Sequence, residues 1–217
     1  MATTSDDIDA GFSARIRVET LDVHAEAEQT PFVADLLDGR LTREHYARFA
    51  VQLHAIYGTL EAVVDANRDR DPVVARFFAP ELARVPSLQR DLEFLLGDDW
   101  VTVPVLPATQ AYCERITEVG KWPAGLLAHH YVRYLGDLSG GQVIGRALQR
   151  IYELEDRRGV DFYFFDGIPS AKAFKDRYRA MLDELPWAAD EQARFIDEVK
   201  RAYRHNTAVF HALADQG

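Results

Sequence analysis

Prolines, glycines and helix-capping residues divide the chain into about eight stretches that repeat their apolar residues with the period of an α-helix. No alternating run of four to eight residues between hairpin turns, the pattern of a β-strand, stands out. The clearest helical stripe lies in residues 43–68, where apolar side chains recur at steps of three and four: Tyr46, Phe49, Leu53, Tyr57, Leu60 and Val64. The sequence therefore predicts an all-α fold.

Caps and breakers also set the limits of the other expected elements. Two short helices begin at Pro31 and Pro72, and longer ones cover residues 13–28, 87–96, 108–119, 123–152, 171–185 and 190–214. We expect a loop over residues 98–107 and a turn or short irregular strand over residues 161–170. No repeat or linker interrupts the chain, so we expect a flexible N-terminal segment (1–12) followed by one helical domain (13–215) with a shared core.

Composition excludes several classes of function. The formal net charge is -10 and no block of Lys and Arg interrupts it, so a general affinity for nucleic acid or anionic membranes is not expected. The single cysteine, Cys113, cannot form an internal disulfide, which is typical of proteins of the reducing cytosol. There is no signal-peptide pattern and no apolar run of roughly 18 residues, so we expect a cytoplasmic protein without a membrane segment.

Glycines interrupt an otherwise regular helical pattern in residues 131–145: Gly136, Gly140, Gly141 and Gly145. Each glycine inside a helix costs about 1 kcal/mol relative to alanine, so something must offset them. Gly136 and Gly140 are four residues apart on one face, where the main chain can approach something flat and wide, or the helix can kink. A close helix–helix crossing is the alternative. Asp137 and Ser139, which lie between the glycines, favour a ligand surface.

A second unusual segment lies at the end of the first expected helix. His24 and Glu28 share one face, so the carboxylate can accept a hydrogen bond from one ring nitrogen and leave the other free for a metal. A surface ion pair is the alternative. His129 and His130 are adjacent and cannot share a helix face, so we expect them to pack in the core or cap a helix. The remaining histidines lack a matched partner and are expected to be structural or solvated: His45, His54, His205 and His211.

Together the two segments resemble the heme oxygenases, and most closely the soluble bacterial ones. Residues 130–142, HYVRYLGDLSGGQ, are similar to the distal-helix signature of that family, and His24 with Glu28 resembles its proximal helix. The similarity extends from about residue 13 to residue 210. It implies a single-domain helical bundle that binds heme between a proximal helix and a kinked distal helix.

The resemblance also implies roles for residues on the two faces of the heme. His24 would be the axial ligand of the iron, and Glu28 would accept a hydrogen bond from its imidazole. The main chain at Gly136 and Gly140 would lie over the macrocycle and tilt bound oxygen toward one meso edge. The carboxylate of Asp137 would hold the distal water that delivers a proton, in a hydrogen-bond network completed by three further residues: Tyr57, Arg133 and Asn206.

Further residues match those that hold the heme propionates and edge in this family. The expected propionate anchors are Arg17, Tyr131, Lys175 and Arg179, and further heme contacts are expected from Ser139, Gly141 and Tyr203. Tyr203 replaces an expected phenylalanine, and Arg17 stands where many relatives have lysine. Without the resemblance, Lys175 and Arg179 would be interpreted as a solvated helix face.

The activity implied is the cleavage of heme b by O2 to biliverdin, with release of ferrous iron and carbon monoxide. Heme would be substrate and cofactor at once, and we expect the alpha isomer of biliverdin. No flavin or nicotinamide site is visible, so electrons would come from an external ferredoxin or flavin reductase; we also expect a monomer. The alternative is a heme-binding carrier or sensor on the same fold, but Asp137 and the glycines favour the enzyme.

Overall fold

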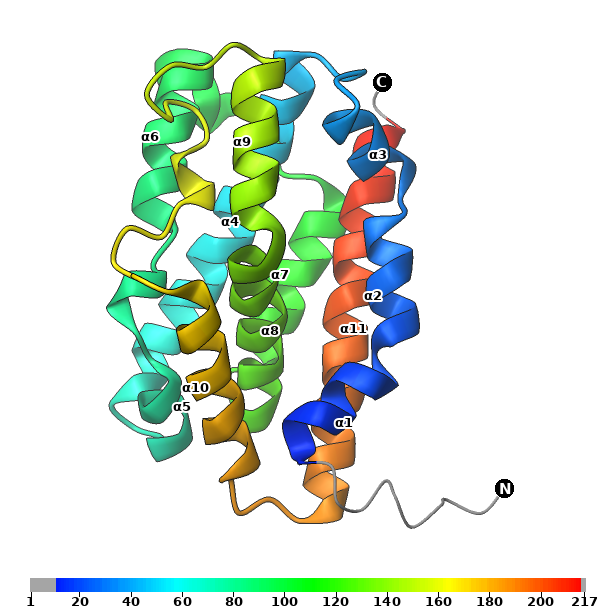
Figure 1. Ribbon diagram of the computed structural model, residues 1–217, viewed down its shortest axis with the longest axis vertical. Helices are drawn as coiled ribbons and strands as arrows, with labels where there is room; N and C mark the ends of the chain where they lie inside the picture. The colour runs from blue at the N-terminus through cyan, green and yellow to red at the C-terminus, as the bar shows by residue number, and fades with distance from the viewer. Residues whose placement is uncertain (1–10, 216–217) are drawn as a thin grey trace.

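The computed structural model describes residues 11–215, and this part of the chain contains helices and no β-strand. The prediction of an all-α fold is therefore confirmed. The main helices, labelled in Figure 1, are α1 (Phe12–Glu19), α2 (Leu21–Glu28), α3 (Pro31–Leu37), α4 (Arg43–Arg68), α5 (Pro72–Phe77), α6 (Val85–Leu96), α7 (Pro107–Val119), α8 (Pro123–Gly136), α9 (Gln142–Ile151), α10 (Ala171–Asp183) and α11 (Ala189–Ala214).

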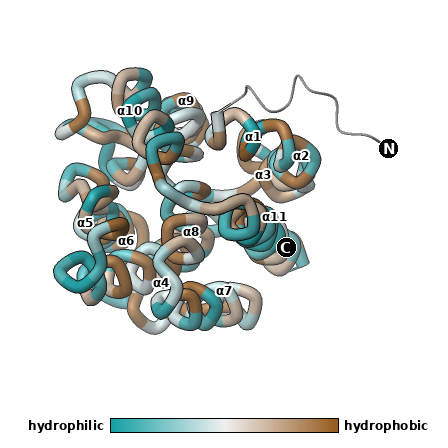
Figure 2. Tube along the Cα trace, turned by 90° about the horizontal axis from the view of Figure 1, so that it is seen from below, coloured by the Kyte–Doolittle hydropathy of each residue, from teal (hydrophilic) through white to brown (hydrophobic). Residues whose placement is uncertain are grey.

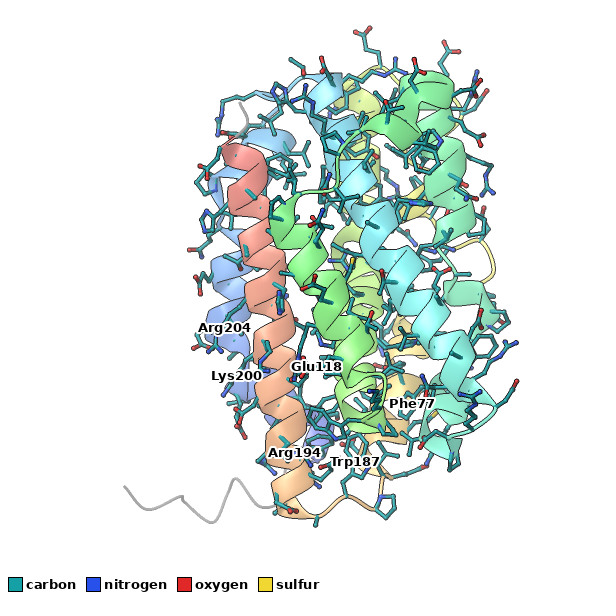
Figure 3. The ribbon with its side chains drawn as sticks, turned by 180° about the vertical axis from the view of Figure 1, so that it is seen from behind. Phe77, Glu118, Trp187, Arg194, Lys200 and Arg204 are labelled. Atoms are coloured by element: carbon teal, nitrogen blue, oxygen red, sulfur yellow. The ribbon has the colours of Figure 1, made fainter. Side chains whose placement is uncertain are left out.

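Helix α8 is the central element of the bundle. Residues 124–135 of this helix are all buried, and Figure 2 shows other helices around it on all sides. Its most extensive packing partner is α11, while α4 packs mainly against α6 and α7. Because α8 is apolar on every face, it can be stable only inside the bundle, and it therefore fixes where the site can be built.

Local signals in the sequence place most helix ends correctly. The apolar stripe of α4 is buried as predicted, and Thr42 caps this helix by accepting a hydrogen bond from the main chain of His45. Asp71 caps α5, which begins at Pro72. Gly97 ends α6 in the left-handed region, with φ of 68°, where a residue with a side chain would be strained.

The first helix differs from its prediction, because residues 13–28 form two helices that meet at Thr20. Thr20 has φ of -118° and ψ of 8°, and its hydroxyl donates to the carbonyl of Ile16 at 2.7 Å. This bond competes with the continuing helix. The break gives the two helices different partners, since α1 packs against α10 and α2 packs against α11 (Figure 1).

The expected helix over residues 123–152 is interrupted at the glycines. Residues Asp137–Gly141 form a π-helical turn between α8 and α9. A π-turn holds one more residue than an α-turn, and such turns occur frequently at functional sites. We refer to this segment as the π-turn.

Two short predictions are wrong. The expected loop over residues 98–107 begins with a 3₁₀ helix, Gly97–Thr102, and residues 161–170 contain a 3₁₀ turn, Asp161–Tyr163, with no strand. A third short 3₁₀ helix spans Pro80–Leu82. Residues 1–10 of the expected flexible segment lie outside the described residues, so the proposed division at residue 12 stays a prediction.

None of the helices within residues 11–215 combines the length and the hydrophobicity that crossing a bilayer would require.

Candidate functional site

Four of the predicted site residues are joined by hydrogen bonds, although they come from α4, α8, the π-turn and α11. The hydroxyl of Tyr57 donates to the carboxylate of Asp137. The guanidinium of Arg133 donates from Nε to the Tyr57 hydroxyl at 3.1 Å, and from Nη1 to Oδ1 of Asn206 at 2.8 Å. We call these four residues the distal network.

Burial controls the proton affinity of the distal network. It raises the pKa of Asp137, although the charge of Arg133 and the hydrogen bond from Tyr57 oppose the shift. Burial also raises the pKa of Tyr57 well above its ordinary value. Desolvation acts to lower the pKa of Arg133, but Tyr57 and Asp137 outweigh it, so the pKa is raised and the guanidinium stays charged. Asp137 is therefore a stronger base than a surface aspartate, beside a permanent cation.

The glycines of the interrupted helix fall into two groups. A Cβ atom built on Gly136 or Gly140 would meet nothing within 4 Å, so the main chain faces open space at both positions. A Cβ on Gly141 would contact the ring of Tyr163 at 3.6 Å, and one on Gly145 would come within 2.8 Å of the Tyr163 Cβ. The close-packing interpretation thus holds for Gly141 and Gly145, while Gly136 and Gly140 present bare main chain. Gly141 is buried and does not line the open face.

The predicted proximal pair is formed on α2. Nδ1 of His24 lies 3.5 Å from Oε2 of Glu28, and the His24 side chain is 44% exposed, so a large ligand can reach it. The ring of Tyr203, on α11, stands edge-on to the imidazole, with centroids 5.4 Å apart and planes at 84°. The imidazole is therefore held on two sides and accessible on another.

Helix α11 sets the proximal pair and the distal network at one level of the bundle. Tyr203 and Asn206 are three residues apart on one face of this helix. Tyr203 contacts His24 on α2, while Asn206 accepts the hydrogen bond from Arg133 on α8. A rigid helix thus aligns a histidine on one side with the distal network on the other.

The predicted propionate anchors gather around Tyr131. Burial raises the pKa of the Tyr131 phenol, and the charges of Arg179 and Arg17 oppose that shift, so both guanidinium groups lie close to it. Nζ of Lys175 donates to the Ser139 hydroxyl at 2.9 Å. Nε of Arg179 is buried without a hydrogen-bond partner. A buried, unpaired cationic donor is the kind of group that a carboxylate ligand satisfies.

Sequence reasoning did not find one charged residue that acts on the distal network. Arg84 is buried and donates from Nη1 to the carbonyls of Phe162 and Phe164, at 3.1 and 2.8 Å. Its charge helps to oppose the rise in the pKa of Asp137. Arg84 precedes α6 in a stretch of ordinary polar residues, so no spacing or motif marks it.

These observations fit a flat macrocycle that carries a metal and two carboxylates. One exposed imidazole, bare main chain at two glycines and a cluster of cationic groups are the three features such a ligand needs. The family model of the heme oxygenases matches residues 10–212 of the chain. The chain belongs to the heme oxygenase family. This confirms the predicted family and the prediction of an enzyme of heme degradation.

Curated relatives of this heme oxygenase come from distant organisms. A heme oxygenase of Takifugu rubripes is 38% identical over 203 residues, which cover 93% of this chain and 73% of the relative. A heme oxygenase of the alga Porphyra purpurea is 36% identical over 201 residues, which cover 91% of this chain and 84% of the relative.

Solved structures of heme oxygenases share the fold. Heme oxygenase-1 of the cyanobacterium Synechocystis, solved in complex with heme, superposes with a TM-score of 0.89 and 34% identity, covering 95% of this chain and 94% of that one. Heme oxygenase from Leptospira interrogans gives a TM-score of 0.87 and 32% identity, with 93% and 98% covered. The predicted single-domain heme oxygenase fold is therefore confirmed.

Proposed function

We propose that this chain binds heme b between His24 and the main chain of Gly136 and Gly140, and cleaves it with O2 to biliverdin, ferrous iron and carbon monoxide. The observation that carries the proposal is the distal network, which includes a carboxylate of raised pKa and lies beside the two bare glycines. A protein that only stored heme would need no buried proton donor beside an open face.

His24 is the proposed axial ligand of the iron, through the ring nitrogen that does not face Glu28. The carboxylate of Glu28 accepts from Nδ1, which fixes the tautomer and makes the imidazole a better donor to the metal. Tyr203 restricts rotation of the ring by its edge contact. Heme, when bound, supplies the iron that binds and activates O2.

Gly136 and Gly140 determine which meso position of the macrocycle is attacked. Their main chain can approach to a distance that any larger side chain would prevent, and they restrict the space left for O2 to one edge. We propose that this edge is the alpha position, so that the product is the alpha isomer of biliverdin.

Asp137 is the proposed proton source. Its carboxylate holds a water molecule on the open side and receives a hydrogen bond from Tyr57 on the other. Arg133 and Asn206 keep Tyr57 in place, and the charge of Arg133 favours the ionised form of Asp137 after each transfer. The distal network thus restores its own protonation state from solvent.

The propionates are proposed to bind at Tyr131, Arg17, Lys175 and Arg179. Contact with the unpaired Nε of Arg179 would satisfy a buried donor, and the Lys175 ammonium can leave the Ser139 hydroxyl for a carboxylate. This anchoring sets the rotation of the macrocycle within its plane. Ser139 and Gly141 follow the bare main chain along the same turn and are proposed to contact the macrocycle or its anchors.

Electrons are proposed to come from a separate ferredoxin or flavin reductase, because no motif for a flavin or nicotinamide is visible in the sequence. We also propose that the enzyme works as a monomer in the cytoplasm.

The proposal is tested by adding hemin to the purified protein and recording its absorption spectrum. Ascorbate or a ferredoxin with its reductase is then added under air. Enzymatic cleavage predicts a Soret band that decays as biliverdin absorption and carbon monoxide appear. A Soret band that persists would identify a heme carrier and overturn the proposal.

A further inference from the structure

A cavity of about 220 Å³ lies between α4, α8 and the segment that joins α5 to α6. None of the predicted heme-site residues lines it. Its apolar wall includes Val64, Phe78 and Leu82, and its polar wall consists of Glu61, His130 and Tyr134. The guanidinium of Arg68 also lines the cavity, stacked 4.4 Å above the Phe78 ring. We call this space the rear cavity.

Two polar atoms of the rear-cavity wall have no partner among residues 11–215. Oε1 of Glu61 accepts from the main-chain N–H groups of Arg84 and Val85, at 2.5 and 3.2 Å, but Oε2 accepts from none. His130 is only 5% exposed; its Nδ1 lies 3.0 Å from the Tyr178 hydroxyl, and its Nε2 has no protein partner. Buried polar atoms normally find a partner, so these two point to something that occupies the cavity.

The size and walls of the rear cavity select a small flat molecule. An apolar cavity of roughly 150 Å³ holds benzene, so 220 Å³ accommodates one or two fused rings. The rings of Phe78, His130 and Tyr134 form much of its surface, and His130 and Tyr134 lie 4.5 Å apart between centroids. Aromatic rings prefer other aromatic rings at such edges and faces.

The charges around the rear cavity select a neutral molecule with a hydrogen-bond donor. The free Glu61 oxygen requires an N–H or O–H group. Burial raises the pKa of Glu61, whereas the two main-chain N–H bonds and the Arg84 charge oppose the shift. Since Arg84 and Arg68 both lie near this carboxylate, a cationic ligand would be repelled as well as attracted.

We propose that the rear cavity binds a small neutral aromatic molecule that carries one N–H or O–H donor, such as indole or phenol, with the donor on Oε2 of Glu61. Such an occupant contacts Tyr134, whose ring packs edge-on against Tyr57 with centroids 5.7 Å apart. The site is therefore one side chain away from the distal network, on the side of α8 that carries no bare glycine.

Indole is the probe for the test, with the full-length heme complex as the protein. We expect titration calorimetry to detect indole binding, and crystals soaked with indole to show it against His130 and Tyr134. We expect 1-methylindole, which lacks the donor, to bind at least tenfold more weakly. Glu61→Gln should produce a similar loss, because its amide oxygen will remain on Arg84 and Val85 and will turn the NH2 group toward the ligand.

A variant that fills the rear cavity separates this site from the heme site. Ala83→Leu adds a side chain at the lining and should abolish indole binding while leaving the Soret band unchanged. Ala62→Leu, at an exposed position beside Glu61, is the matched control and should bind indole normally. Ordered water alone in the soaked crystals, indole at the heme, or equal affinity for indole in Ala83→Leu and Ala62→Leu would each overturn the proposal.

Discussion

Tyr57, in the middle of α4, donates its hydroxyl hydrogen bond to the carboxylate of Asp137, which follows it by 80 residues and opens the π-turn. The bond joins the helix with the longest apolar stripe to the turn that carries the bare glycines. It also fixes the direction of the Asp137 side chain, away from the face of Gly136. A carboxylate in that position can hold water over an open face without filling it.

Replacing Asp137 with alanine should remove the proton source and leave the binding of heme intact. General acid–base catalysis commonly contributes about 10²-fold to 10⁴-fold, so we expect the biliverdin yield to fall by at least about 10²-fold. Product absorption and the release of carbon monoxide measure this loss, and the Soret band of the ferric complex is the control. An undiminished yield would remove Asp137 from the mechanism.

His24→Ala should abolish turnover of heme, because no other imidazole is held next to Glu28. Since His24 is partly exposed, added imidazole can enter the space it leaves and should restore part of the activity. The measurement is biliverdin formation with and without imidazole. Full activity of the variant in the absence of imidazole would show that another residue binds the iron.

Gly140→Ala should raise stability and lower activity. The added Cβ meets nothing within 4 Å, and alanine is favoured over glycine inside a helix by up to about 1 kcal/mol, so the melting temperature should rise or stay the same. Heme turnover should fall or shift to other biliverdin isomers. Gly145→Ala is the opposite control: its Cβ comes within 2.8 Å of Tyr163, so it should destabilise the fold. A normal product pattern in Gly140→Ala would contradict this account.

Lys175→Ala should loosen one propionate and change the proportions of the biliverdin isomers more than the overall rate. Lys175 is half-buried beside Ser139, where burial and then the charge of Arg179 lower its pKa. Arg177→Ala, on an exposed position of the same helix, is the matched control and should leave the isomers unchanged. Chromatography of the products distinguishes the two. Identical isomer patterns in both variants would exclude Lys175 as an anchor.

A buried ion pair away from the heme site predicts a pH dependence of stability. Glu198 is 3% exposed and accepts from Arg115 at 2.8 and 2.6 Å, with Nε2 of His129 3.0 Å away. Burial acts to raise the pKa of Glu198, but Arg115 and His129 outweigh it and lower the value to about 2. Since the folded pKa lies below the unfolded one, the stabilisation is complete above about pH 5 and is lost between about pH 4.5 and pH 2.

Glu198→Gln should therefore cost about 2 kcal/mol of unfolding free energy at pH 7, and progressively less as the pH falls below 4.5. Denaturant unfolding of both proteins across this range measures the difference. A cost that does not depend on pH would mean that the lost packing, and not the charge, is responsible.

Features set by nearby residues could be predicted from the sequence. Asp71 before Pro72 and Gly97 after α6 mark helix ends because caps act within one turn. The alignment of Gly136 with Gly140 needs only helical spacing. The identity of the distal network, by contrast, came from resemblance to the family, because nothing local indicates that Asn206 meets Arg133.

Features that depend on distant partners could not be predicted in this way. The break at Thr20 follows from α1 and α2 having different neighbours, which the continuous helical pattern of residues 13–28 does not reveal. Arg84 reaches Asp137 only because the chain folds back over α4. His129 was expected to pack in the core or cap a helix, and its partner Glu198 lies 69 residues away.

The π-turn also has a consequence for how the chain tolerates changes in length. Because one residue advances an α-helix by about 100°, deleting a single residue between Asp137 and Gly141 would let α8 and α9 merge into one regular helix but rotate everything after it by over a quarter of a revolution. Gly145 would then turn away from Tyr163 and a side chain would collide in its place. Insertions and deletions should therefore be rejected here even where substitutions are accepted.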